Sequence, residues 1–190
     1  MITVLRPTEA DEQLSTAGLK CPACAGALAP WGYARSRSVR GRDGNLKLRP
    51  RRARCRDCRT THVLLPATLL PRRTATVEVI GAALLAKVTG ASHHSIAADL
   101  DLPADTVRGW IRSATAHASW LYARGTITAH RFDPELPPIL PTGTALGDAI
   151  AALGIAAAAA KRRLGRPVTP WEFITQFTGG HLLTPLARAS

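Results

Sequence analysis

The sequence predicts an α+β protein that is mostly helical, with a small β unit first and helices after it. Two CxxC pairs frame a strand-like segment that contains turn residues. Apolar residues then recur at helical spacing from about residue 74. An Ala-rich helical segment follows a Pro-rich stretch near the C-terminal end. The 190 residues suffice for one medium domain or two small ones.

Charge and composition narrow the class of partner. The chain has 25 Lys and Arg against 13 Asp and Glu, a net charge of +12, which favours a polyanion such as nucleic acid or an anionic membrane. The longest weakly polar run, residues 145–160, is mostly Ala and contains Asp148, so it does not suit a bilayer. No signal peptide is recognisable. We therefore expect a cytoplasmic, nucleoid-associated protein with no membrane partner.

The N-terminal unit, residues 1–66, is predicted to be a short strand followed by a zinc ribbon. Its cysteines are the only ones in the chain and have the spacing of ligands for one structural Zn²⁺: Cys21, Cys24, Cys55 and Cys58. Thirty residues separate the two pairs, which fits an extended hairpin with Asp43-Gly44 at its tip. The alternatives are a redox CxxC or free thiols, but no βαβ pattern surrounds the pairs. His62 is a spare ligand candidate and is better explained as an ordinary strand histidine.

Basic residues crowd this hairpin. Between Arg35 and Arg59 there are eleven Lys and Arg against two Asp. A solvated face is the alternative, but close cations repel one another, and contact with phosphates would relieve that cost. The predicted nucleic-acid contacts are Arg35, Arg37, Arg40, Arg42, Lys47, Arg49, Arg51 and Arg52.

Residues 72–124 are predicted to form a helix-turn-helix domain. One helix precedes Gly90, a second spans 92–100 with Ser92 as its N-cap, and a third starts after Pro103 and continues to about Arg124. The twenty residues from His93 to Arg112 fit the motif, with apolar residues where the two helices meet: Ile96, Leu100, Leu102, Val107 and Trp110. Ala97 supplies the small residue, and Asp101 stands where Gly is common. The alternative is a plain helical hairpin.

The docking geometry of this motif assigns roles on the second helix. Arg108 is the best candidate to read a base, guanine in particular, and Thr106 and Arg112 suit phosphates. Asp105 suits either a cytosine amino group or the helix cap. The full predicted set is Ser92, His93, His94, Ala104, Asp105, Thr106, Arg108, Gly109 and Arg112.

The last third is predicted to be a Pro-rich linker, residues 125–143, and a C-terminal helical module, residues 144–190. Within the module, an Ala-rich helix runs from Thr144 to Leu164, and Thr169 opens a capping box for a final helix that ends before Gly179-Gly180. Two roles stay open for this module. It packs back on the helix-turn-helix, or it forms a surface for a second copy or for a transposase.

These motifs together resemble an uncharacterised actinobacterial family that joins a zinc ribbon to a helix-turn-helix. The resemblance rests on the CxxC pairs, the Trp-Gly-Tyr strand, Thr-His-Val-Leu-Leu-Pro and Thr-Val-Arg-Gly-Trp-Ile-Arg. Residues 20–115 are also similar to the N-terminal DNA-recognition part of insertion-sequence transposases. Such a transposase continues into a nuclease domain with three acidic residues. After Arg124 this chain has only four acidic residues and too little strand-like sequence for that domain: Asp133, Glu135, Asp148 and Glu172.

The function expected from the sequence is therefore non-enzymatic. We expect a zinc-stabilised, sequence-specific protein that binds double-stranded DNA, as a transposition accessory or a transcription regulator, with itself or a transposase as a further partner and no small-molecule substrate. The alternative is an interaction module that binds RNA or protein through the basic ribbon. A thiol redox enzyme is a third hypothesis, which stoichiometric zinc in the purified protein would exclude.

Overall fold

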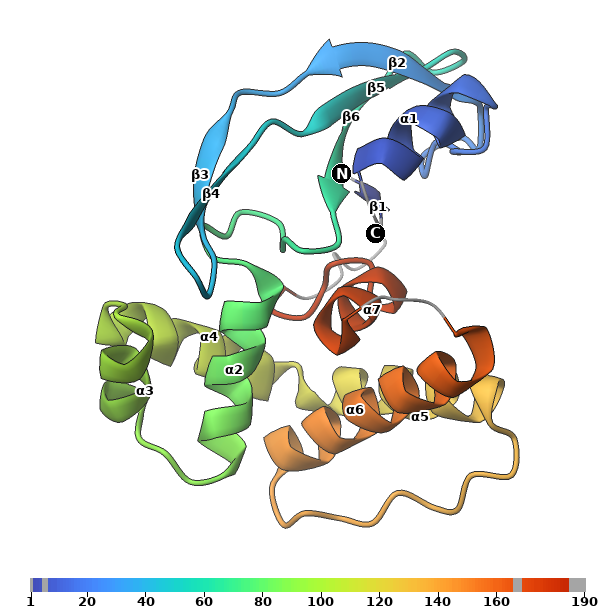
Figure 1. Ribbon diagram of the computed structural model, residues 1–190. Helices are drawn as coiled ribbons and strands as arrows, with labels where there is room; N and C mark the ends of the chain where they lie inside the picture. The colour runs from blue at the N-terminus through green and yellow to red at the C-terminus, as the bar shows by residue number, and fades with distance from the viewer. Residues whose placement is uncertain (1, 5–6, 166–168, 185–190) are drawn as a thin grey trace.

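A computed structural model of the protein describes residues 2–4, 7–165 and 169–184, and it has a small β unit above a larger helical unit (Figure 1). The chain is 47% helical and 19% strand, with the sheet on the N-terminal side and the helices after it. The predicted α+β, mostly helical class is confirmed. No described helix combines the length and apolarity needed to cross a bilayer.

The β unit is a four-stranded sheet with one covering helix. Strands β1 (Ile2–Val4), β6 (Thr61–Pro66), β5 (Arg51–Cys55) and β2 (Leu28–Tyr33) lie in that order, and only β1 and β6 are parallel. Helix α1 (Pro7–Ser15), between the predicted strand and the cysteine loops, packs on the sheet through Ala10 and Leu14. Leu28 and Leu64 complete this small core.

The basic hairpin is a separate two-stranded ladder of β3 (Arg37–Arg40) and β4 (Asn45–Leu48). The register of β2 against β5 shifts between Pro30 and Tyr33, and their pairing continues to Tyr33 and Arg51; beyond that point β3 and β4 pair with each other. The turn lies at Asp43-Gly44 as predicted, and Gly44 has a φ of 130° there. Val39 is buried against Leu65 of β6 and against Leu69, which follows β6, and the hairpin bends down towards the helices (Figure 1).

Three helices form the predicted helix-turn-helix region: α2 (Val77–Val88), α3 (His93–Leu100) and α4 (Ala104–Ala116). Asp101 ends α3 in the left-handed conformation, with φ 50° and ψ 56°, as its place in the turn required. Ile96, Val107 and Trp110 are buried where α3 and α4 meet α2. Leu100 and Leu102 are half-buried at the edge of that contact.

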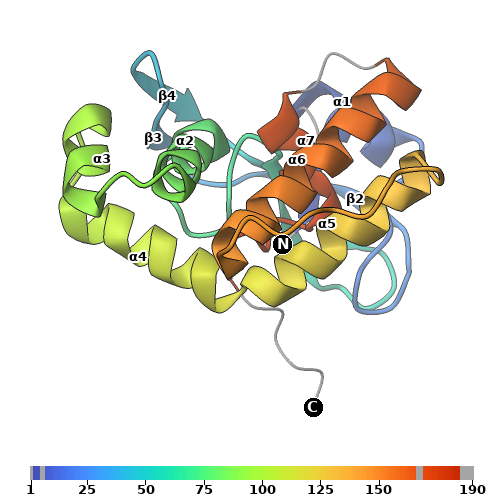
Figure 2. The same cartoon turned by 90° about the horizontal axis from the view of Figure 1, so that it is seen from below.

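The predicted end of the third helix and start of the linker were wrong. Helix α4 ends before His117, and α5 (Ala118–Phe132) then occupies the first part of the predicted linker. α5 lies along α6 (Ala145–Leu164), the most extensive helix contact in the described chain (Figure 2). The two backbones approach closely, since a Cβ at Gly125 would lie 2.7 Å from the carbonyl carbon of Ala152. A small-residue interface of this kind carries a weak apolar pattern, which explains the error.

The last helix joins α2 and α6 in one core. Helix α7 (Pro170–Phe177) has the predicted capping box at Thr169, and its Trp171 lies directly against Gly81 of α2. Buried residues from α2 through α7 form one continuous cluster. The predicted domains 72–124 and 144–190 are therefore a single helical unit, and the C-terminal helices pack back on the helix-turn-helix. Residues 166–168 and 185–190 of the predicted module lie outside the described part.

Candidate metal centre and basic surface

Two similar loops hold the four cysteines. Cys21 and Cys24 precede β2, while Cys55 ends β5 and Cys58 lies in the turn to β6. In each loop the first cysteine donates its backbone N–H to a carbonyl five residues later, at 2.8 Å for Cys21 and 2.9 Å for Cys55. A left-handed residue follows each pair, Ala25 with φ 59° and Arg59 with φ 63°. This repeated local geometry directs both thiol pairs towards the same point.

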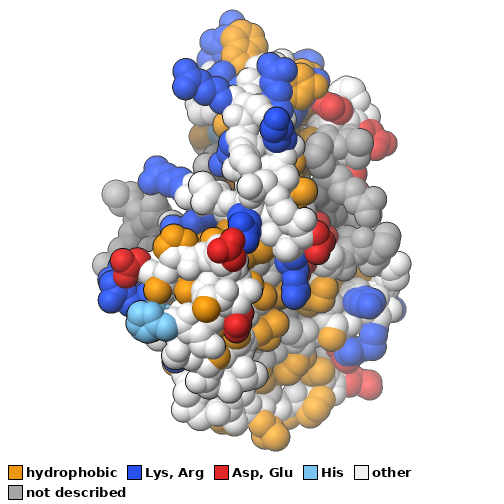
Figure 3. Space-filling model, turned by 60° about the vertical axis from the view of Figure 1, so that its left-hand side comes forward, with side chains coloured by type: hydrophobic (Ala, Val, Ile, Leu, Met, Phe, Trp, Pro, Cys, Tyr) orange, Lys and Arg blue, Asp and Glu red, His pale blue; other side chains and the backbone are white. Residues whose placement is uncertain are grey.

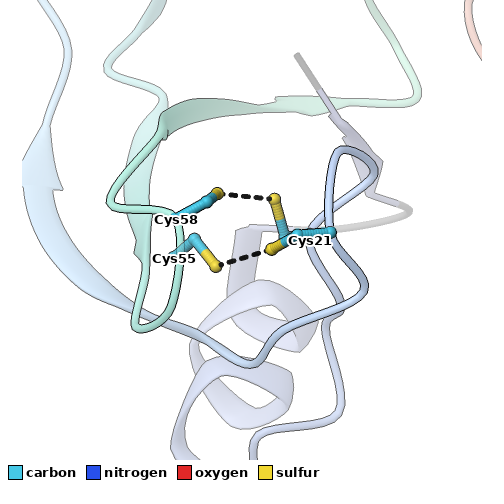
Figure 4. Close-up of side chains that lie close together, drawn as sticks. Cys21, Cys55 and Cys58 are labelled. Carbon is cyan, nitrogen blue, oxygen red and sulfur yellow. Dashed lines mark hydrogen bonds between the residues drawn. The ribbon is translucent and has the colours of Figure 1, made fainter.

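The sulfur positions suit one metal ion. All four Sγ atoms lie within 4.8 Å of one another, with Cys21–Cys58 at 3.6 Å and Cys24–Cys55 at 3.4 Å (Figure 4). Tetrahedral coordination with Zn–S bonds of about 2.3 Å separates the sulfurs by about 3.8 Å. Gly26 fits this packing, since a Cβ there would lie 3.0 Å from Cys55 Sγ and closer still to the Asp57 carboxylate. The four cysteines can therefore hold a metal and are compatible with a single Zn²⁺.

Two neighbouring side chains support the sulfurs. His62 is buried in β6 with its Nε2 3.3 Å from Cys21 Sγ, so an imidazole N–H can donate to a thiolate there. Burial lowers the pKa of His62 and favours the neutral ring. Hydrogen bonds from the Thr60 hydroxyl and backbone N–H lower the pKa of Cys58 to about 6, which favours its ligand form. The sequence explained His62 as an ordinary strand histidine, and its place four residues after a knuckle was the available signal.

The predicted hairpin cations divide into two groups. Arg35, Arg42, Lys47 and Arg49 are exposed, while Arg37, Arg40, Arg51 and Arg52 are half-buried. Two of the second group are in ion pairs, Arg51 with Asp11 at 2.5 Å and Arg40 with Asp101 at 2.9 Å. Lys and Arg side chains gather over the upper part of the face in Figure 3, which is the β unit. The exposed group is the better candidate for contact with a polyanion.

Exposed aromatic rings lie among the basic residues, and they were not among the nucleic-acid contacts predicted from the sequence. Trp31 is 49% and Tyr33 47% exposed on β2. The guanidinium carbon of Arg54 lies 4.6 Å from the centre of the Trp31 ring, and that of Arg51 lies 4.5 Å from the Tyr33 ring. The signal was present as a Trp-Gly-Tyr strand opposite an Arg-rich one.

Helix α4 presents a polar face away from the core. Val107 and Trp110 point inward, whereas Asp105, Arg108 and Arg112 are exposed. The predicted neighbours Ala104 and Thr106 are half-buried. Open space surrounds Gly109 on the side where a Cβ would project. Of the predicted α4 residues, the structure thus places Asp105, Arg108 and Arg112 at the outer surface, while Ala104 packs against the core.

Some of the predicted DNA-contact residues on α3 and α4 also bind other residues of the protein. Arg108 and Asp105 form an exposed ion pair of 2.9 Å along the helix. At the start of α3, the Ser92 hydroxyl accepts the Ser95 backbone N–H at 3.1 Å, so Ser92 is the predicted N-cap. The rings of His93 and His94 lie beside it with centroids 4.2 Å apart.

Comparison with known proteins gives one match. A family model described as "Domain of unknown function (DUF6431)" matches residues 21–110, just under half of the chain. The match starts at the first cysteine and ends at Trp110, so it spans the four cysteines, the hairpin, α2, α3 and the first half of α4. No curated protein and no solved structure matches.

Proposed function

We propose that this protein is a zinc-stabilised, sequence-specific DNA-binding protein, a transposition accessory or transcription regulator rather than an enzyme. The observation that carries the proposal is the α3–α4 pair. Its turn is short and left-handed at Asp101, its inner face is apolar, and its second helix offers Arg108 and Arg112 to solvent. Those are the features by which a recognition helix enters a major groove.

Zinc has a structural role in this proposal. Four thiolates fill a tetrahedral shell, so substrate would find no open coordination position. When bound, the ion would fix the two loops that carry β2 and β5, and with them the attachment of the hairpin. The chain's own residues do the rest: His62 and Thr60 hold the sulfurs, and the exposed hairpin cations face solvent.

Recognition is divided between two elements. The exposed hairpin cations supply phosphate contacts and affinity, which carry no sequence information. Arg108 reads a base edge, exchanging its exposed pair with Asp105 for a bidentate contact to guanine. Because both partners of that pair are well exposed, at 64% and 87%, little stability is lost in the exchange.

Three of the four acidic residues after Arg124 have partners within the protein. Asp133 pairs with Arg162 at 3.0 Å. Asp148 accepts the Thr142 backbone N–H at 2.5 Å, and Glu172 belongs to the capping box of α7. Each of these three carboxylates has a structural partner of its own, and the residues come from separate parts of the helical unit. This arrangement does not favour the clustered carboxylates of a two-metal nuclease.

Selection of bound duplexes from a random DNA pool tests the proposal directly. We expect a defined consensus and an affinity that falls steeply as salt rises. Arg108→Ala should lose about 1–3 kcal/mol of discrimination at one base pair while non-specific affinity changes little. Arg131→Ala, at an exposed position of α5, is the matched control and should change neither. A wild-type protein that yields no consensus would contradict sequence-specific binding.

One observation favours a second candidate function, an RNA- or protein-binding module. The exposed rings of Trp31 and Tyr33, with arginines over them, suit stacking on unpaired bases or on a protein surface. Competition separates the two functions. The RNA- or protein-binding module would be favoured if structured RNA displaces the protein from labelled duplex DNA at a lower concentration than unlabelled duplex DNA does. Trp31→Ala should then remove this preference for RNA.

A further inference from the structure

Arg40 connects the β unit to the turn of the helix-turn-helix. Its Nη2 lies 2.9 Å from Asp101 Oδ2 and 3.4 Å from the backbone oxygen of Leu100, so one guanidinium binds the carboxylate of the turn and the end of α3. The sequence had placed Arg40 among the residues that contact nucleic acid. Its side chain is 36% exposed, and its Nη2 already has two acceptors within the protein.

The backbone of Arg40 is held as well. Its N–H donates to the Thr74 carbonyl at 2.7 Å, and its own carbonyl accepts the Thr76 N–H at 2.9 Å. Thr76 is the N-cap of α2, so the end of β3 is bonded to the segment that starts the helical unit. The neighbouring Val39 is buried, at 1% exposure, against Leu65 and Leu69. Backbone, apolar and ionic contacts therefore fix the hairpin at a single place.

The residue that Arg40 binds determines the geometry of the motif. Asp101 is left-handed, and the direction in which the chain leaves this residue sets the angle between α3 and α4. A charged partner on its carboxylate favours one arrangement of the turn. Through Arg40 and Asp101, the position of the hairpin is thus coupled to the orientation of α4.

We propose that Arg40 is a positioning residue that joins the hairpin and the helix-turn-helix into one DNA-reading surface. The hairpin cations and the outward face of α4 then contact one continuous duplex in a fixed register. The inference rests on the proposed function and adds that the two elements act as a unit. The family match supports it, since residues 21–110 contain both elements and the junction between them.

Arg40→Gln and Arg42→Gln distinguish positioning from phosphate contact. Both remove one charge from the hairpin, but Arg42 is exposed at its tip. Arg42→Gln should weaken a selected and a scrambled duplex of equal length alike and reduce the salt slope by about 0.9. Arg40→Gln should leave the slope unchanged and weaken the selected duplex about two- to five-fold more than the scrambled one. If Arg40→Gln behaves like Arg42→Gln, the proposal is overturned.

Asp101→Asn gives a test in which the two explanations differ in sign. If Asp101 only repels phosphates, removing its charge should tighten binding to both duplexes. If it holds the turn through Arg40, the selected duplex should bind more weakly and discrimination should fall. Asp99→Asn removes an equal charge two residues away on an exposed site of α3 and serves as the control. Tighter binding with intact discrimination in Asp101→Asn would also overturn the proposal.

A measurement without DNA separates failure of this inference from failure of the proposed function. The amides of Asp101 and Leu102 donate to Ala98 and Ala97 within the turn. Their hydrogen exchange should be faster in Arg40→Gln than in the wild type and unchanged in Arg42→Gln. Equal exchange in all three proteins overturns the junction itself, whereas faster exchange with no duplex bound by the wild type overturns only the DNA-binding function.

Discussion

The β unit and the helical unit are held together in different ways. Among the described residues, the core of the β unit contains eight buried apolar side chains, and two of them are cysteines. The core of the helical unit contains twenty-three. A core as small as the first is rarely sufficient for a stable fold, and a structural metal is a common remedy. The comparison indicates that a metal held by the four cysteines would replace apolar burial in the β unit only.

Metal removal should have the largest effect, and it tests most directly whether the two units are stabilised differently. A structural zinc contributes on the order of 10 kcal/mol to folding, so a strong chelator or Cys55→Ser should unfold the β unit. The helical unit should stay folded because its core is continuous without it. Amide NMR spectra should lose the dispersed signals of β2, β5 and β6 and keep those of α2 to α7.

The matched control for metal loss lies in the same loop. Ala23→Ser introduces the same hydroxyl at an exposed position between Cys21 and Cys24, so zinc content and spectra should match the wild type. Loss of the helical signals together with the strand signals would show that the units fold as one, which contradicts the comparison.

A cavity in the helical unit should have the next largest effect. Leu121 of α5 is fully buried, and Leu121→Ala should lower the free energy of unfolding of the helical unit by about 2–5 kcal/mol. Ile127 on the same helix is 62% exposed, and Ile127→Ala should stay within about 0.5 kcal/mol. Denaturant unfolding followed by helical circular dichroism measures both, and zinc content should not change in either. Equal losses in the two variants would contradict the burial assigned to α5.

Prediction of the fold from sequence succeeded where a local motif requires particular residue types. Two CxxC pairs predicted the clustering of the four cysteines, Asp43-Gly44 predicted the hairpin tip, and Thr169 predicted the capping box that the structure contains. It failed at α5, because the small residues around Gly125, which pack on the Ala-rich face of α6, look like a linker when read locally. Their role exists only in the pair, where small residues allow two backbones to approach. Close packing between distant segments has no local signal.

The candidate site shows the same limit. The cluster of four cysteines was predictable from spacing, but the contact of His62 with Cys21 joins residues forty-one positions apart. The ion pair of Arg40 with Asp101 spans sixty-one positions, so a charge run in the sequence could not distinguish this arginine from its exposed neighbours. Which cations are free to bind a polyanion is decided by tertiary structure.

Substitution of His62 should have a smaller effect, which concerns the zinc affinity of the β unit. His62→Ala removes a donor to the Cys21 sulfur, and loss of such an outer partner typically lowers metal affinity about 10- to 100-fold. Competition for zinc against a chromophoric chelator measures the change. His62→Gln retains an N–H donor and should lose less zinc affinity than His62→Ala. The two variants therefore separate the contribution of the hydrogen bond from that of side-chain packing. Full zinc affinity in His62→Ala would show that the four sulfurs need no support.

The smallest effect concerns Ser92, which has a structural role in the helical unit and a predicted role in DNA contact. Ser92→Ala removes the cap of α3 and should cost about 1 kcal/mol in the free energy of unfolding. Ser92→Asp keeps an acceptor for the Ser95 N–H and should restore that stability. A carboxylate near phosphates should nevertheless weaken duplex binding if Ser92 lies at the DNA backbone. Thermal unfolding and duplex affinity of the two variants therefore separate the cap from the contact, and unchanged affinity in Ser92→Asp would leave Ser92 with the cap alone.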